Sequence, residues 1–403
     1  MNVPNRLRTS LAAESFCCYR TAAFAALFAF AMIHAPYSSS AQDKKKDDVS
    51  AAPLVTIDRP VAAITALAFS QDGKKLALGT YGQVVVYDTA TWKQTVVCRQ
   101  IVDSARSLAF SPDGNSLAIG CGLPGMNGIA LVWDLSPAGK PHAYPPQKDV
   151  VESISYSKDG KSLLYGSDDN RACYLAALPA DKGANLDEHN GRVQAVAFSP
   201  KNGYVFITGA ADRIVKVWDE KSVHTIANFD QSEGAVTGLA FINDNQFVGS
   251  SLDGKLYWWG VYFDEKKKVY GGYHFRTTQA HDGGVFALGI SENRNRVISS
   301  GADNHIRIWR NDGAQEHDFD TCKLPAYAVA LSPDGKLAVA GGREGAVYIW
   351  DVDGNKFIDA LIPPALPLPP APKTAAAVKT VTKTKTAATT KSAKSNRQKK
   401  AIR

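Results

Sequence analysis

Two sets of side chains in this chain could form a hydroxyl–imidazole–carboxylate relay, the arrangement that activates a serine or threonine as a nucleophile. The first set is His189, Thr208 and Asp212, and the second is His281, Ser299 and Asp303. In both sets a tryptophan follows the aspartate by six residues, at Trp218 and Trp309. An active site is seldom duplicated within one chain, whereas a structural device often is. The duplication therefore favours a buried hydrogen-bond network over catalysis, because a buried imidazole, carboxylate and indole N–H all require partners.

Both sets lie within a repeated unit. A short apolar run followed by a turn occurs seven times, for example as LAFSPDG (108–114) and VALSPDG (329–335). The residue that begins the turn stands at 70, 111, 157, 199, 242, 291 and 332, so that successive copies are 41 to 49 residues apart. Self-similarity at a period of this size is the signature of a repeat architecture.

Each unit continues with further runs of alternating apolar residues, such as KLALG (75–79) and VVVYD (84–88). This period-two alternation between Gly, Asp, Asn and Pro turns predicts short strands. Four strands in each of seven units predict an all-β fold, a seven-bladed β-propeller of four-stranded antiparallel blades over residues 54–362. Pairing at the chain ends would close the ring, and either KFIDAL (356–361) or LVTI (54–57) could supply the outer strand of the closing blade.

The third run of most units ends in an aromatic residue. The pairs at this position are Tyr87–Asp88, Trp133–Asp134, Tyr174–Leu175, Trp218–Asp219, Trp259–Gly260, Trp309–Arg310 and Trp350–Asp351. With these endings the chain resembles the WD40-repeat β-propellers, in an exported, bacterial-type form with a basic low-complexity C-terminal tail. The resemblance implies that the matching His, Ser or Thr, Asp and Trp form a hydrogen-bonded chain inside a blade. It also implies a common role in protein–protein interaction.

The first 41 residues are predicted to be a secretory signal peptide. Three arginines precede an apolar run at 21–33, and the small residues Ser39 and Ala41 favour cleavage after Ala41. An uncleaved anchor is the alternative, but thirteen helical residues would span only ~20 Å of a ~30 Å hydrocarbon core. We expect residues 42–53 to be flexible. The mature protein should then be exported (periplasmic, secreted or at the cell surface) without a transmembrane segment.

The charge of the chain is unevenly distributed. The formal net charge of +7 combines +10 from residues 373–403, +2 from residues 1–41 and −5 from the residues between them. Residues 363–372 (PPALPLPPAP) read as an extended Pro-rich linker, and 373–403 as a basic disordered tail that cannot build a core. The tail could contact a polyanion without specificity, or it could be solvated without a partner. Its basic residues are Lys373, Lys379, Lys383, Lys385, Lys391, Lys394, Arg397, Lys399, Lys400 and Arg403.

The sequence favours neither a metal site nor a cofactor site. Cysteines remain after the predicted signal peptide at Cys98, Cys121, Cys173 and Cys322, without a C-x-x-C pair. Buried free thiols are the expectation, with a single disulfide left open. A phosphate-binding glycine loop, a G-x-S-x-G motif and a calcium loop are also missing from the sequence, and we expect no catalytic residue.

The fifth unit carries an unusual aromatic segment, YWWGVYFDEKKKVYGGYHF (257–275), as the hairpin between its third and fourth strands. Exposed aromatic residues beside charges are typical of recognition surfaces, although alternate aromatics in a blade strand are more often core, because the strand packs against a neighbouring blade. The candidate binding patch is Tyr262, Phe263, Tyr270 and Tyr273. Insertions at 121–128 and 166–171 also suggest loops on one face of the ring, where ligands could bind.

Three functions are compatible with this sequence. The first is a non-catalytic, monomeric scaffold that binds an unidentified protein partner outside the cytoplasm, with the tail as a possible tether to polyanions. The alternative is an exported propeller enzyme or a small-molecule or carbohydrate binder that uses the mouth of the central channel. A nucleic-acid-linked protein, with the tail as the binder and an uncleaved leader, is the third. Fold alone does not identify the partner.

Overall fold

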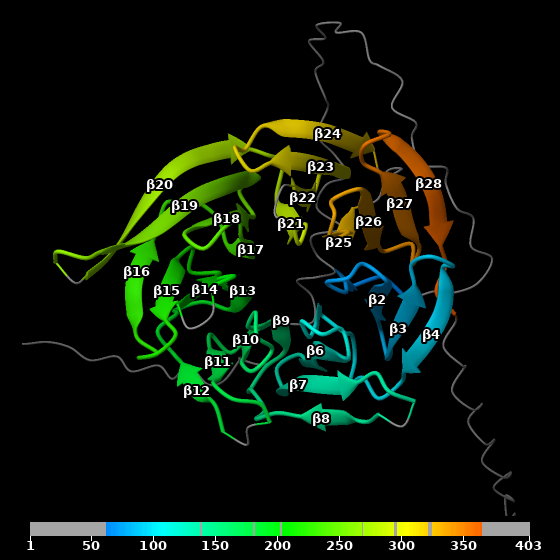
Figure 1. Ribbon diagram of the computed structural model, residues 1–403, viewed down its shortest axis with the longest axis horizontal. Helices are drawn as coiled ribbons and strands as arrows, with labels where there is room; N and C mark the ends of the chain where they lie inside the picture. Colours follow the sequence, from blue (N-terminus) through cyan, green and yellow to red (C-terminus); the bar gives the residue numbers. More distant parts are fainter. Residues whose placement is uncertain are drawn as a thin grey trace, which may run out of the picture. The chain divides into compact units, whose positions relative to one another are not determined.

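The computed structural model describes residues 62–364, apart from 138, 180–181, 202–203, 268, 294–295 and 321–324. These residues form seven four-stranded sheets arranged as a ring (Figure 1), and every strand pairs antiparallel with its sequence neighbour within the sheet. The predicted all-β, seven-bladed propeller is therefore confirmed. The predictions for residues 1–41, 42–53 and 373–403, and for most of the linker 363–372, lie outside the described residues.

We number the blades one to seven in chain order. Each blade contributes one strand to each of four positions, from the innermost to the outermost. The innermost strands are β1 (Ala66–Phe69), β5 (Ser107–Phe110), β9 (Val151–Tyr156), β13 (Val193–Phe198), β17 (Val236–Phe241), β21 (Val285–Ile290) and β25 (Ala326–Leu331). The second strands are β2 (Lys75–Thr80), β6 (Ser116–Leu123), β10 (Leu163–Ser167), β14 (Val205–Ala210), β18 (Gln246–Ser251), β22 (Arg296–Gly301) and β26 (Leu337–Gly342).

The third strands are β3 (Gln83–Asp88), β7 (Asn127–Asp134), β11 (Ala172–Leu175), β15 (Val215–Asp219), β19 (Lys255–Asp264), β23 (His305–Arg310) and β27 (Val347–Asp351). The outermost strands are β4 (Lys93–Cys98), β8 (Pro141–Ala143), β12 (Ala184–Leu186), β16 (Thr225–Phe229), β20 (Val269–Gln279), β24 (Gln315–Asp320) and β28 (Lys356–Leu361). Because successive strands are antiparallel, the turns after the first and third strands lie at one end of the ring, which we call the lower end. The turns after the second and fourth strands lie at the upper end.

A local hydrogen-bond pattern explains the recurring Ser-x-Asp-Gly turns between first and second strands. In blade one the Ser70 hydroxyl donates to the Asp72 carboxylate over 2.7 Å, and the Lys75 N–H donates back to Ser70 Oγ. Gly73 has a φ of 71°, a conformation that glycine adopts without a steric penalty. Blades two, three and seven repeat the Ser–Asp bond, at Ser111–Asp113, Ser157–Asp159 and Ser332–Asp334. The sequence motif therefore sets the lower-end turns.

The hydrophobic core lies between neighbouring blades. One cluster joins Trp258 of blade five to Trp309 of blade six, and another joins Trp259 of blade five to Phe229 of blade four. The two adjacent tryptophans of β19 thus point to opposite neighbours, as the alternation of a strand requires. Of the four cysteines considered above, Cys98, Cys121 and Cys173 are buried free thiols, and Cys322 is not described.

The ring closes between blades seven and one. The strand β28 fills the outermost position of blade seven, whereas the other candidate, 54–57, lies outside the described residues. Across this seam the Ile64 N–H donates to the Gly342 carbonyl over 2.9 Å, and Gln83 Nε2 donates to the Pro364 carbonyl over 2.9 Å. Side chains of both blades form one apolar cluster around Ile64. The described ends therefore meet through hydrogen bonds and apolar packing between two complete sheets.

Candidate functional site

The structure brings each predicted relay together inside its blade. His189 Nδ1 lies 2.9 Å from the Asp212 carboxylate, and His189 Nε2 lies 2.8 Å from Thr208 Oγ1. The Trp218 indole N–H donates to the same Thr208 oxygen over 2.9 Å. With the carboxylate beside Nδ1, the imidazole proton belongs on Nδ1 and the Thr208 hydroxyl donates to Nε2. Burial raises the pKa of Asp212, but the hydrogen bonds from His189 and the Asn190 N–H outweigh it and hold the pKa below its usual value.

Blade six repeats this geometry. His281 lies 2.8 Å from both Asp303 and Ser299, and the Trp309 indole N–H donates to Ser299 Oγ over 2.9 Å. Thr208 and Ser299 have no exposed surface, so neither hydroxyl can reach a substrate. This arrangement suits a device that fixes strand register better than it suits a nucleophile.

Blade six adds a partner that sequence patterns did not single out. Arg307 donates to Asp303 over 2.6 Å and to Asp318 over 3.2 Å. Lys216 occupies the matching position of blade four, four residues after Asp212. A basic residue at a fixed offset from the relay aspartate is the signal that could have identified both.

Blade seven lacks the relay hydroxyl. The buried Trp350 indole N–H has no hydrogen-bond partner among the described residues. Ala340 stands ten residues before Trp350, at the offset where blades four and six carry a hydroxyl. The alanine side chain at 340 has no hydroxyl group, and this explains why the Trp350 indole N–H lacks an acceptor.

The predicted patch on blade five divides between two faces of the long β19–β20 hairpin. Phe263 pairs with Tyr270, whose ring lies 6.1 Å from that of Tyr204 in blade four. Tyr262 and Tyr273 lie on the opposite face and are 48% and 43% exposed. The four residues therefore do not form one surface, because Tyr270 and Phe263 face blade four.

A set of side chains that the sequence patterns did not reveal lies near the starts of the innermost strands, around the centre of the ring at its upper end. One residue comes from the start of each inner chain segment, always five residues before the residue that begins the lower turn. In blade order the seven are Thr65, Arg106, Glu152, Gln194, Thr237, Phe286 and Tyr327. We call this set the inner ring. Its fixed offset was readable in the sequence, but its residue types differ in every blade except one and five.

Contacts between neighbouring blades link the members of the inner ring. The Thr65 hydroxyl donates to the Ala105 carbonyl of blade two over 2.6 Å, and the Thr237 hydroxyl donates to the Val285 carbonyl of blade six over 2.8 Å. The rings of Phe286 and Tyr327 lie 6.3 Å apart. The inner strands that carry these residues surround the centre of the ring in Figure 1.

Blades two to four form a polar arc of the inner ring. Arg106 lies 3.9 Å from Glu152, and Arg192 lies 3.7 Å from Asp168 beside them. Burial raises the pKa of Glu152 to about 7, although Arg106 opposes the shift. Among the described residues, Arg106 Nε, Asp168 Oδ1 and Gln194 Oε1 are buried without a hydrogen-bond partner. Unpaired buried groups and a perturbed carboxyl are typical of a binding site.

Aromatic residues occupy the other side of the inner ring. Phe286 and Tyr327 are 36% and 42% exposed, although most aromatic rings of the described chain are buried. Further apolar side chains are exposed on the upper turns of blades one, two and five, at Tyr81, Met126 and Leu252. Exposed aromatic groups at the centre of a surface are the usual anchors of protein recognition. The upper end therefore combines apolar anchors with unpaired polar groups.

Comparisons with known proteins agree with this architecture. The WD40 family (WD domain, G-beta repeat) matches residues 98–134, 181–219, 221–260, 272–310 and 315–351. These segments contain the first three strands of blades two, four, six and seven, and those of blade five as far as Gly260. No match covers the first three strands of blades one and three, which carry Tyr87–Asp88 and Tyr174–Leu175 where the other blades carry tryptophan.

Several curated eukaryotic proteins are similar to the chain. A guanine nucleotide-binding protein subunit beta of Zea mays is 24% identical over 56% of this chain and 63% of its own length. Autophagy-related protein 16 of Arabidopsis thaliana is 26% identical over 45% of this chain and 35% of its own length. Striatin-3 of Mus musculus is 26% identical, over 52% of this chain and 32% of its own length.

The chain spans less than two thirds of the length of these relatives. The described residues contain no helix long and apolar enough to cross a membrane. Seven four-stranded blades and five matching segments make the chain a seven-bladed β-propeller that carries WD40 repeats.

Proposed function

We propose that the chain is a protein-binding scaffold that works outside the cytoplasm and holds a peptide segment of its partner at the upper mouth of the channel. The inner ring is the observation that carries this proposal. By blade order, its polar arc lies across the channel from the exposed pair Phe286 and Tyr327. At the lower end, Lys158 of blade three forms an ion pair with Glu292 of blade six, which bridges opposite sides of the ring. A partner would therefore reach the centre of the ring from the upper end.

A peptide fits the unpaired groups of the polar arc. Arg106 and Gln194 are only half-buried as residues, so a rotation of either side chain would let Arg106 Nε donate to a peptide carbonyl or Gln194 Oε1 accept from a peptide N–H. Both atoms are already buried, so that pairing them on binding removes an existing penalty. An apolar side chain of the same peptide would cover Phe286 and Tyr327. This combination of an aromatic anchor and satisfied polar groups is what specific protein interfaces use.

Affinity capture from the native envelope tests the proposal with the full chain as bait and high-salt washes. A discrete protein should be retained, and the double variant Arg106→Ala/Gln194→Ala and the variant Phe286→Ala should each reduce its retention at least about tenfold. The matched control is Tyr262→Ala, which removes an even more exposed aromatic ring away from the inner ring. Retention that survives both mouth variants and is lost in the control would refute the proposed site.

The location and the tail are proposals that rest on the sequence. Removal of the leader after Ala41 would leave a mature chain that begins at Gln42, which N-terminal sequencing of protein from the envelope would detect. A basic tail would bind polyanions through counterion release, so its binding should weaken steeply with salt. Truncation after Pro372 should abolish that binding. An intact Met1 on the native protein, or salt-sensitive binding that survives the truncation, would argue against these two proposals.

A further inference from the structure

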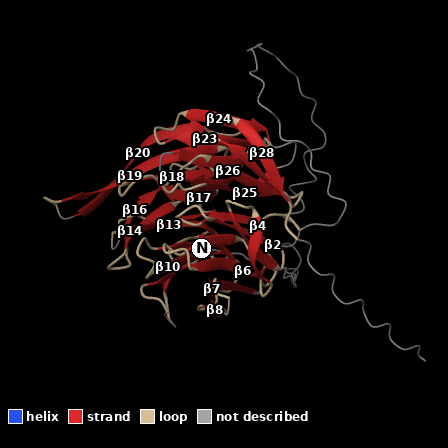
Figure 2. Cartoon of the chain, turned by 45° about the vertical axis from the view of Figure 1, so that its right-hand side comes forward, coloured by secondary structure: helices blue, strands red, loops and turns tan. Residues whose placement is uncertain are grey.

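We propose that the lower end of blade five and its projecting hairpin form a binding site for a neutral glycan chain. The site has two adjoining parts, an amide-lined pocket and an exposed aromatic strip. The strip consists of Tyr262, Tyr273 and Phe275. Figures 1 and 2 show the β19–β20 hairpin extending away from the ring beyond the neighbouring blades. This site is separate from the channel mouth, which lies at the upper end.

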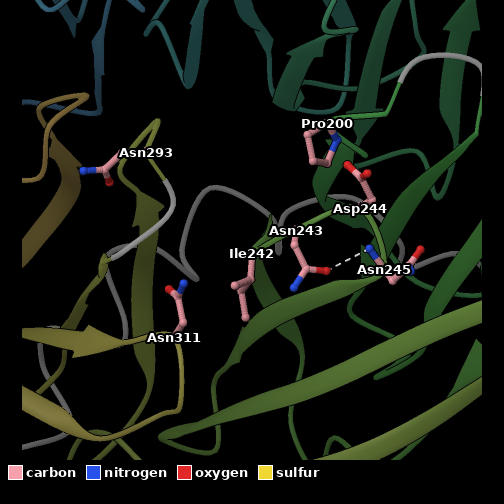
Figure 3. A pocket seen from close by; sticks show the side chains of 7 residues that line it. All are labelled: Pro200, Ile242, Asn243, Asp244, Asn245, Asn293 and Asn311. Carbon is pink, nitrogen blue, oxygen red and sulfur yellow. Dashed lines mark hydrogen bonds between the residues drawn. The ribbon is translucent and has the colours of Figure 1, made fainter.

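The pocket lies among the lower turns of blades four, five and six and has a volume of about 580 Å³. Its walls are Pro200, Ile242, Asn243, Asp244, Asn245, Asn293 and Asn311, shown in Figure 3. Four of the seven are asparagines, each of which offers both a donor and an acceptor. A pocket with so few apolar walls departs from the usual apolar small-molecule site and favours a ligand rich in hydroxyl groups.

Several polar groups of this pocket are available for a ligand. Asn311 Oδ1 is buried and has no hydrogen-bond partner among the described residues. The Asp244 carboxylate and the Asn245 side-chain amide also carry no hydrogen bond or ion pair in the described part of the chain. Asn243, in contrast, is used by the turn, since its Oδ1 accepts from the Asn245 N–H over 2.9 Å. Hydroxyl groups, which donate and accept, could satisfy all three free groups.

The strip exists because two glycines leave room for two tyrosines. Tyr273 stands opposite Gly260 on the neighbouring strand, and Tyr262 stands opposite Gly271. A Cβ on Gly260 would lie 2.3 Å from the Tyr273 ring, and one on Gly271 would lie 2.4 Å from the Tyr262 ring. Each tyrosine therefore lies across its glycine on the sheet surface, which leaves much of the ring exposed. The Tyr273 ring lies 6.4 Å from that of Tyr262 and 5.8 Å from that of Phe275.

Strand register orients the strip toward the pocket on the side of blade five that faces blade six. Within the sheet, Gln246, which follows the pocket residue Asn245, pairs with Gly260, and Gly260 pairs with Tyr273. On blade six, the turn that holds Asn311 also holds Gly313. A Cβ on Gly313 would lie 2.5 Å from the Arg276 side chain, next to the base of the strip. A chain-like ligand could therefore occupy both parts together.

A neutral glycan suits this surface better than a polyanion does. Sugar rings present flat C–H faces that pack against aromatic rings, while their hydroxyls pair with amides and carboxylates. Charges around the strip nearly cancel, because Asp264 and Glu265 accompany the lysines of the hairpin turn, Lys266, Lys267 and Lys268. Asp244 similarly offsets Arg276 across the site. A polyanion site would instead require a clear excess of basic residues.

Affinity gel electrophoresis of the full chain tests the proposal with glycogen, mannan, xylan, mixed-linkage β-glucan and soluble chitin oligosaccharides as probes. At least one of these neutral glycans should retard migration. Tyr273→Ala and Asn311→Ala should each weaken that association constant between about twofold and tenfold. Tyr273→Phe should retain binding, because the aromatic face remains. The matched control Phe286→Ala removes an exposed ring from the inner ring and should leave glycan binding unchanged.

The melting temperature of each variant shows that it is folded, and Asn311→Ala gives an independent test that leaves the hairpin intact. Retardation by none of the five glycans would overturn the proposal. So would retardation that is equal in wild type, Tyr273→Ala and Asn311→Ala. Binding of heparin or of an unstructured peptide library that depends on Tyr273, without binding of any neutral glycan, would assign the surface to a different class of ligand. None of these outcomes depends on whether the channel mouth binds a protein.

Discussion

Replacing Ser299 by alanine should destabilise the ring although no large side chain is lost. Ser299 Oγ is the acceptor for the Trp309 indole N–H at 2.9 Å and the partner of His281 Nε2 at 2.8 Å. The substitution leaves both nitrogens buried without partners. A buried unpaired group costs about 1–3 kcal/mol, so the loss of two partners should lower the free energy of unfolding by about 2–5 kcal/mol. Thermal denaturation followed by circular dichroism should show a fall in Tm of about 5–10 °C.

Blade four provides the matched control for this variant. It performs the same task with Thr208, so Ser299→Thr keeps the hydroxyl and should leave the stability of the chain close to wild type. The added methyl group can introduce at most modest overpacking. If Ser299→Ala unfolds within about 0.5 kcal/mol of wild type, the relay contributes little to stability, and the case for a structural role against catalysis loses its main support.

Three further outcomes are expected. Ala340→Ser should give the Trp350 indole N–H an acceptor and stabilise the chain by about 1 kcal/mol, which thermal denaturation would measure; an unchanged or lower Tm would contradict this explanation. Glu152 has a pKa of about 7 in the folded chain, which is above its ordinary value. The folded state therefore binds this proton more tightly than the unfolded state does. The free energy of unfolding gains fully from it below the unfolded pKa and declines as the pH rises toward 7. Glu152→Gln should therefore be more stable than wild type by about 1–3 kcal/mol at pH 8, and its free energy of unfolding should depend less on pH between 5 and 8. Urea denaturation across this range would measure both effects, and a pH profile identical to that of wild type would refute the burial of Glu152. Lys158→Ala should change the free energy of unfolding by less than about 1 kcal/mol, because the ion pair with Glu292 is partly exposed; a double-mutant cycle would reveal any larger coupling.

The sequence alone was sufficient to predict the blades, because their signals are local. Alternating apolar residues fix the strands, and the Ser70–Asp72 type of turn is built within a few residues. It could not decide the closing strand, since 54–57 and 356–361 alternate equally well. The division of the patch between two faces, in contrast, follows from strand alternation alone, because Tyr262 and Phe263 are adjacent and Tyr270 and Tyr273 are three residues apart.

The inner ring escaped prediction for a different reason. Its position is fixed by the repeat, but Arg106, Glu152 and Phe286 share neither charge nor shape, so no motif marks them. Only the closure of the ring brings these residues of distant blades around one channel. The pocket at Asn311 likewise combines turns of three blades, and no local pattern reports such a juxtaposition.

The seam between blades seven and one has a mechanical consequence. Elsewhere along the described chain a covalent connection crosses each boundary between blades, whereas at the seam Ile64 meets Gly342 and Gln83 meets Pro364 through hydrogen bonds and apolar packing. A force applied to the two ends of the described chain would act directly on this seam, because no covalent connection within the described residues crosses it. The ring would then open between blades seven and one, and it could close again because each blade keeps all four of its strands.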